Sequence, residues 1–166
     1  IGIMNKINKV LTEMIKYYAG DPKRIQHFIK VYNFAKLIGE SENIDSQAQY
    51  ILETAAVVHD IGIKASEKKY NSSAGKYQEL EGPPLAEKLL SRLGYPRQDI
   101  ERICFLIGHH HTYENIHEID YQILVEADFL VNAFEDSMSD KSIQNVCSRL
   151  FKTKTGTWLL KTMFLK

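Results

Sequence analysis

Apolar residues recur at three- and four-residue intervals along nearly the whole chain, and this spacing constrains the fold more than any other feature. The first such run consists of Ile7, Val10, Leu11, Met14, Ile15 and Tyr18. One face of an α-helix repeats every 3.6 residues, so each run predicts an amphipathic helix. No segment alternates convincingly with a period of two, as a half-buried strand would. The sequence therefore predicts an all-α protein.

Capping and helix-breaking residues mark the expected boundaries. Asp21 followed by Pro22 suits an N-cap and a first helical turn, and Gly94 suits a helix end. We expect helices at about 7–18, 22–39, 46–62, 83–94, 96–111, 121–134, 143–151 and 157–165. Residues 63–82 show little periodicity and are expected to form a long loop, which in a compact domain usually has a function.

The size and charge of the chain narrow the classes of function. A chain of 166 residues suits one domain with one core, and the 21 Lys and Arg balance the 21 Asp and Glu. Binding to a nucleic-acid polymer or a membrane is therefore not expected, and no apolar run approaches the ~20 residues of a membrane span. The start lacks the pattern of a signal peptide, and Cys104 and Cys147 are far apart, which indicates reduced cysteines in a cytoplasmic protein.

A buried carboxylate is expected near the middle of the sequence. The small apolar run Ala-Ala-Val-Val at 55–58 leads directly into His59 and Asp60, followed by Ile61 and Gly62. A carboxylate in such a water-poor place is costly unless it is paired. A cation would neutralise Asp60 if other ligands can reach it.

Candidate ligands lie on other predicted helices. His27, Asp128 and one or two histidines of the run 109–111 fall at inward or helix-end positions. Two histidines with two aspartates suit a five- or six-coordinate divalent ion (Mn, Fe, Co, Ni or Mg) with water in its open positions. Structural zinc instead prefers a closed, cysteine-rich tetrahedron. An open site can activate a bound water and stabilise charge on a phosphoryl oxygen.

The order His27, His59-Asp60, Asp128 resembles the HD-domain superfamily of metal-dependent phosphohydrolases. The flanking residues are also similar: 55–62 resembles that family's helix end, and Glu-Ala-Asp-Phe-Leu at 126–130 resembles its closing motif. The resemblance is strongest over 24–134. It implies one HD-type domain over 1–166, a compact helical bundle with a metal site in its core, and a C-terminal helical extension at 135–166. It also implies that His27, His59, Asp60 and Asp128 are the ligands of the principal metal.

Some members of the family bind a second metal through additional histidines, and the sequence resembles the family less closely at those positions. A histidine expected before the helix that follows the long loop is missing, and Glu79 or Glu81 could replace it as a ligand or general base. In the later run, His110 shares a helical face with Ile103 and Ile107, which favours it as the inward residue. His109 is the next candidate, and His111 is expected to touch solvent.

A second departure concerns phosphate binding. Ile63 stands where many relatives carry lysine directly after Gly62, and Lys64 could take over the contact or could only be solvated.

The leading hypothesis is a phosphohydrolase that cleaves a small phosphoester, preferably a nucleotide, by attack of a metal-bound water. Asp60 would orient that water and bridge to a second ion if one binds. Lys64, His109 and His110 would contact the phosphate, and Glu79 or Glu81 would serve as second-metal ligand or proton acceptor. The partner would be this small anionic substrate, and the sequence leaves a homo-oligomer open.

Two alternatives belong to other classes. A di-iron oxygenase would need two irons, against which the missing histidine argues. A regulatory module would keep the metal or bind a nucleotide without turnover.

Overall fold

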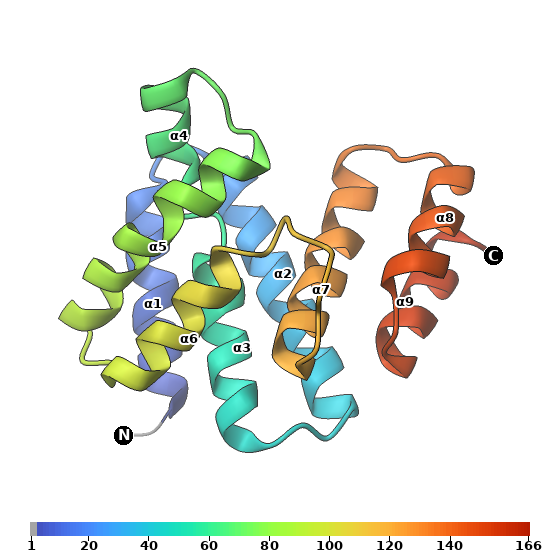
Figure 1. Ribbon diagram of the computed structural model, residues 1–166, viewed down its shortest axis with the longest axis horizontal. Coiled ribbons are helices and arrows are strands. Elements are labelled where there is room, and N and C mark those ends of the chain that lie inside the picture. The colour runs from blue at the N-terminus through green and yellow to red at the C-terminus, as the bar shows by residue number, and fades with distance from the viewer. Residues whose placement is uncertain (1–2) are drawn as a thin grey trace.

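The computed structural model describes residues 3–166, which form helices and no strand (Figure 1). The all-α prediction is confirmed. The helices are α1 (Ile3–Tyr17), α2 (Pro22–Ser41), α3 (Ser46–Val58), α4 (Ile63–Tyr70), α5 (Gly75–Arg92), α6 (Arg97–Ile107), α7 (Ile119–Glu135), α8 (Asp140–Leu150) and α9 (Lys154–Phe164).

Helix α3 lies at the centre of the bundle. It packs against α1, α2, α6 and α7, and every residue from Tyr50 to Val58 is buried. Ala55 and Ala56 are fully buried, and their small side chains allow neighbouring helices to approach. Because α2 and α7 also pack against each other, the C-terminal end of α3 is enclosed by both. Residues that follow α3 therefore emerge in the interior.

Local capping fixes where the helices around this point begin. The Asp21 carboxylate accepts a hydrogen bond from the backbone N–H of Arg24 at 3.2 Å, and Pro22 occupies the first turn of α2. Asp45 caps α3 by accepting from the N–H groups of Gln47 and Ala48. Both are N-caps of the kind that satisfies otherwise unpaired donors.

The prediction of a long loop at 63–82 is wrong, because most of this segment is helical. Residues 63–70 form α4, and α5 begins at Gly75, so that Pro83 and Pro84 lie inside a helix and not at its start. Half of the residues of the short helix α4 are charged, so its sequence shows no clear apolar periodicity. Close packing joins α5 to the turn at Gly62 that precedes α4. A Cβ at Gly62 would lie only 2.7 Å from the Gly82 nitrogen and 2.8 Å from the Gln78 carbonyl oxygen, so only glycine allows this approach. Helix α5 thus touches the turn that follows Asp60.

Both cysteines, Cys104 and Cys147, are free thiols, as the sequence indicated. Within residues 3–166, no helix combines the length and the apolar character needed to cross a bilayer.

A buried carboxylate attaches the C-terminal helices to α7. Glu126 is fully buried, and its Oε2 accepts hydrogen bonds from the Gln122 side chain (2.6 Å) and from the backbone N–H groups of Lys152 (2.9 Å) and Thr153 (3.0 Å). Its Oε1 accepts from the Thr153 hydroxyl at 2.6 Å. A Cβ at Gly156 would collide with this carboxylate, so the close approach of α9 to Glu126 of α7 requires glycine at position 156.

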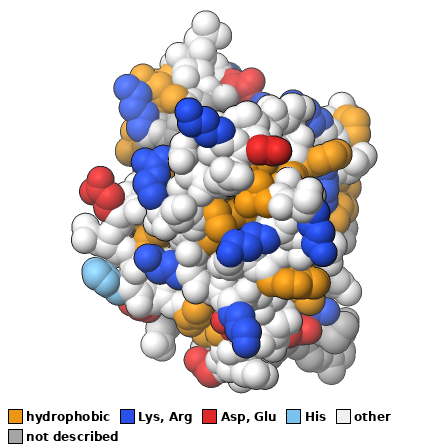
Figure 2. Space-filling view, turned by 90° about the vertical axis from the view of Figure 1, so that its right-hand side faces the viewer, with side chains coloured by type: hydrophobic (Ala, Val, Ile, Leu, Met, Phe, Trp, Pro, Cys, Tyr) orange, Lys and Arg blue, Asp and Glu red, His pale blue; other side chains and the backbone are white. Residues whose placement is uncertain are grey.

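The outer side of α8 and α9 faces the viewer in Figure 2, which shows basic side chains standing singly among apolar ones. Phe134 of α7 and Trp158 of α9 are among the large apolar side chains that remain exposed, at 69% and 61%.

Replacing Glu126 with leucine should destabilise the protein by about 3 kcal/mol or more, because several buried donors lose their acceptor. Urea unfolding followed by circular dichroism measures the change in the free energy of unfolding. The exposed Glu114→Ala serves as control and should change it by less than about 0.5 kcal/mol. Equal stability of the two variants would show that this carboxylate does not anchor the C-terminal helices.

Candidate metal centre

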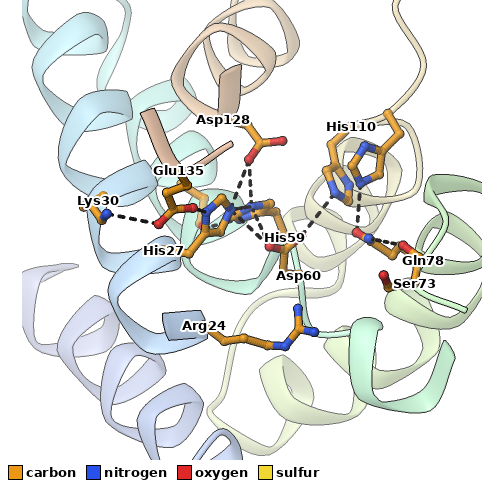
Figure 3. A network of polar contacts seen from close by, with 12 residues as sticks. Arg24, His27, Lys30, His59, Asp60, Ser73, Gln78, His110, Asp128 and Glu135 are labelled. Carbon is orange, nitrogen blue, oxygen red and sulfur yellow. Dashed lines mark hydrogen bonds and ion pairs between the residues drawn. The ribbon is translucent and has the colours of Figure 1, made fainter. Parts of the chain in front are cut away.

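Four side chains predicted as ligands from the sequence converge on one point at the end of α3 (Figure 3). His27 comes from α2, Asp128 from α7, and His59 and Asp60 from the turn after α3. His27 Nε2 lies 3.1 Å from Asp60 Oδ2 and 3.2 Å from Asp128 Oδ1. His59 Nε2 lies 3.3 Å from each of the same two oxygens. Residues separated by up to 101 positions thus place nitrogen and carboxylate atoms around a common centre.

The far nitrogen of each imidazole is held by an acceptor. His27 Nδ1 lies 2.6 Å from Glu135 Oε1, and His59 Nδ1 lies 2.7 Å from the carbonyl oxygen of Ala56. A carbonyl oxygen can only accept, so His59 Nδ1 carries a proton and donates it. Burial alone would raise the pKa of Glu135, but His27 and Lys30 lower it, which keeps Glu135 an ionised acceptor. When the imidazoles are neutral, both Nε2 lone pairs point into the centre.

These four groups fit a divalent cation. The two Nε2 atoms face each other at 3.2 Å, and when both imidazoles are neutral the buried Asp128 Oδ1 receives no hydrogen bond from the described residues. Neutral imidazole lone pairs and carboxylates repel one another unless a cation or protons lie between them. Ligand atoms at about 2.0–2.2 Å from one ion would be roughly 3.0–3.5 Å apart, which matches the observed spacing. Mixed imidazole and carboxylate donors suit the divalent ions named from the sequence.

Without an ion, the same carboxylates favour protonated imidazoles. Burial alone would lower the pKa of His27, but hydrogen bonds with Asp128 and Asp60 outweigh it and raise that pKa to about 10. The pKa of His59 is likewise raised, since Asp60 and Asp128 outweigh burial. Burial would raise the pKa of Asp128, but His59 and His27 hold it well below its usual range. Protons therefore compete with a metal for this centre.

His110 and His111 lie beside Asp60 on the side away from His27. His110 is fully buried, its Nδ1 is 2.6 Å from the Ile107 carbonyl oxygen, and its unpartnered Nε2 faces Asp60 Oδ1 at 3.5 Å. Asp60, His110 and His111 form a second group of atoms close enough to share an ion.

The expectation that His111 faces solvent and that His109 is the next inward candidate is wrong. Helix α6 ends at Ile107, so the histidine run lies in a turn where helical phase no longer applies. His109 stacks on Phe105 with ring centroids 4.1 Å apart, and its Nδ1 lies 2.7 Å from the Phe105 carbonyl oxygen. His111 lines the cleft instead, with Nε2 2.8 Å from Gln78 Oε1. Burial, followed by the charge of His110, lowers the pKa of His111 to about 4.

The two glutamates proposed as substitute ligands are used elsewhere in the fold. Glu79 Oε2 accepts from the backbone N–H of His111 at 3.1 Å and from the Thr112 hydroxyl at 2.9 Å. Glu81 Oε2 accepts from the Tyr70 hydroxyl at 2.9 Å and lies 3.5 Å from Lys69 Nζ. Neither carboxylate lines the cleft. Gln78 lies there instead, linking His111 to the Ser73 carbonyl oxygen, to which its Nε2 donates at 2.6 Å.

Lys64 also points away from the cleft. Its Nζ donates to the Tyr17 carbonyl oxygen at 2.7 Å and lies 4.7 Å from the centroid of the Tyr17 ring. The expected phosphate contact by Lys64 therefore has no support in the structure, and Ile63 lines the cleft.

The metal centre opens into a cleft of about 400 Å³. Asp60 is 16% exposed and is reachable from it. Sequence reasoning did not single out several residues of the lining, among them Arg24, Gln78, Asn132 and Glu135. Only helical phase offered a signal: Arg24 precedes His27 by three positions, and Glu135 follows Asp128 by seven.

Residues 24–150 match the HD domain family. The chain belongs to that family. Its fold is similar to that of a protein from an uncultured Thermotogales bacterium, described as a predicted HD superfamily hydrolase, with a TM-score of 0.65 and 23% identity, covering 95% of this chain and 83% of that one. It is also similar to YpgQ of Bacillus subtilis, with a TM-score of 0.67 and 19% identity, covering 96% of this chain and 87% of that one. The expected family and the HD-like bundle are thereby confirmed. No curated protein matches the chain.

Metal affinity should rise with pH, because binding must displace protons from imidazoles whose pKa the neighbouring carboxylates have raised. Between pH 6 and 8, the dissociation constant for Mn²⁺ should fall by about tenfold per pH unit for each proton displaced. Isothermal titration calorimetry in two buffers of different ionisation enthalpy measures the affinity and the protons released. A dissociation constant independent of pH, with no proton release, would contradict this assignment.

Removing the carboxylate behind His27 should weaken metal binding without removing a ligand. Glu135→Ala should lower the affinity for Mn²⁺ by about 10- to 100-fold, because His27 loses the acceptor that orients it. The control is Asp136→Ala, which removes the same charge from the same cleft without touching His27. Equal losses in both variants would assign the effect to net charge alone.

Proposed function

We propose that this protein is a metal-dependent phosphohydrolase that cleaves a small phosphoester, with a nucleotide as the preferred substrate class. Membership of the HD domain family supports metal-dependent phosphohydrolase chemistry in general. The observation that carries the proposal is the set of two oriented imidazoles facing two carboxylates at 3.1–3.3 Å beside an open cleft.

His27, His59, Asp60 and Asp128 would hold the principal ion in this proposal. When bound, the ion would supply an activated water near neutral pH and would stabilise negative charge on a phosphoryl oxygen. Glu135 and the Ala56 carbonyl keep the two imidazoles turned toward the centre. Such outer contacts fix the ligands before the substrate arrives.

The two carboxylate oxygens of Asp60 face two different groups of side chains. Its Oδ2 faces His27 and His59, while its Oδ1 faces His110. One oxygen can therefore belong to the principal site while the other orients a water or belongs to the second group with His110 and His111. We include a second divalent ion at that group in the proposal, since His110 Nε2 is buried and has no partner among the described residues.

The dimensions of the cleft favour a small substrate. A volume of about 400 Å³ is in the range of small-molecule sites and is too small for a folded polymer. A mononucleotide or a simple phosphate ester fits this size class, and the family resemblance favours the nucleotide.

An activity screen tests the proposal. Metal-stripped protein would be reloaded with Mn²⁺, Co²⁺ or Ni²⁺ and assayed for phosphate release from mononucleotides, dinucleotides and simple phosphate esters. His59→Ala and Asp60→Ala should each reduce kcat/KM by about 10³-fold or more, because each removes a metal ligand. His117→Ala, a change of an exposed histidine, should leave it unaltered. Activity that survives both ligand variants would refute the mechanism.

Two further measurements separate the alternatives. Iron near two per protein in the protein as purified, before any metal is stripped, together with oxygen uptake, would favour the di-iron oxygenase. Tight nucleotide binding with no product across the whole panel would favour the regulatory module.

A further inference from the structure

The cleft contains few fixed positive charges to receive an anion. Among the described residues that line it, the lysine and arginine side chains are Lys23 and Arg24, both in the first turn of α2. The position next to Gly62 is the apolar Ile63, and Lys64 is held at Tyr17. Acidic groups are more numerous, since Asp21, Asp60, Asp128, Glu135 and Asp136 all line the cleft.

Arg24 is well placed to meet a ligand at the metal centre. It precedes His27 by three residues, so the two side chains lie on one face of α2. Figure 3 shows its guanidinium reaching beneath Asp60 toward the side from which Ser73 and Gln78 enter. Lys23 is exposed, whereas the Arg24 side chain is 31% exposed and therefore has a more defined direction.

The present partners of Arg24 leave part of its guanidinium available. Nη2 donates to Glu67 Oε1 at 2.7 Å, and Nε lies 3.3 Å from Asp21 Oδ2. Among the side chains that the structure describes, none places an acceptor on Nη1. Glu67 is 51% exposed, and ion pairs of this kind contribute little to stability because water screens them. The guanidinium can thus leave Glu67 at small cost.

We propose that Arg24 is the substrate-binding cation of this site, and that it exchanges Glu67 for the non-bridging oxygens of the substrate phosphate. This inference rests on the proposed phosphohydrolase function. A guanidinium suits the role because its planar donors can bind two phosphate oxygens at once, which an ammonium cannot do. A divalent ion at the centre would offer the phosphate a coordination position that protonated imidazoles lack, so the anion would need both the ion and Arg24.

Kinetics of the metal-loaded protein test the assignment. With the best substrate of the screen, Arg24→Gln should raise KM by about 10- to 100-fold, as expected when a hydrogen-bonded charge contact is lost. Arg24→Lys should fall between the wild type and Arg24→Gln, because it keeps the charge and loses the planar donors. Arg92→Gln is the matched control, since Arg92 pairs with Glu13 in the groove between α1 and α5.

Glu67→Gln separates substrate binding from a structural role. If Arg24 served only to tether α4, Glu67→Gln would reproduce the defect of Arg24→Gln. Our proposal expects the opposite result, an unchanged or lower KM, because the competing carboxylate is gone. Equal KM increases in both variants, or an Arg24→Gln enzyme with the KM of the wild type, would overturn it.

Binding of inorganic phosphate gives a readout that does not need turnover. Calorimetry should detect phosphate binding to the Mn²⁺-loaded protein, about tenfold or more weaker binding to loaded Arg24→Gln, and none to metal-free protein. The metal content and the thermal melting of Arg24→Gln should match the wild type. Arg24-dependent phosphate binding without any hydrolysis would reject the proposed function and keep only the assignment of Arg24 as a phosphate-binding cation. Phosphate binding that is absent, or independent of Arg24, would reject this inference alone.

Discussion

The repulsion among four side chains that face one another at the end of α3 governs this structure. Each of the two imidazole Nε2 atoms lies 3.1–3.3 Å from an oxygen of Asp60 and from an oxygen of Asp128, in a place mostly shielded from water. Such a group is stable only with positive charge at its centre, supplied by protons or by a divalent ion. The packing of α2, α3 and α7 maintains this arrangement, because each helix contributes to the group directly or through the turn that follows it.

The surroundings prepare the centre for an ion. Glu135 and the Ala56 carbonyl orient the imidazoles, and Lys30 in turn lies 3.0 Å from Glu135. Helices α4 and α5 border the open side, where Gln78 connects His111 with the backbone of Ser73. The cleft is rich in acidic groups and poor in basic ones. In our proposal, an anionic substrate therefore needs both a bound metal ion and the positive charge of Arg24 at the edge of the cleft.

The parts of the fold that could be predicted are those where local signals and tertiary structure agree. Asp21 and Pro22 begin α2 as their side chains dictate, and the apolar periodicity located the long helices. The segment 63–82 could not be predicted in this way. Helix α4 has few apolar residues to show a period, and α5 continues through Pro83 and Pro84 because its packing at Gly62 and Gly108 outweighs the local cost of proline.

The sequence by itself determined the kind of centre, since His27, the pair His59-Asp60 and Asp128 could be chosen from residue type, phase and flanking motif. Tertiary structure alone decided the surrounding roles. Glu79 accepts hydrogen bonds from the turn at His111 and Thr112. Lys64 donates to the Tyr17 carbonyl oxygen, and His109 stacks on Phe105. Arg24, Gln78 and Glu135 line the cleft instead. The physical reason is that buried imidazoles and carboxylates around one cation have few other residue types that could replace them. A long polar side chain near a cleft instead binds whichever partner the packing of other helices places within reach.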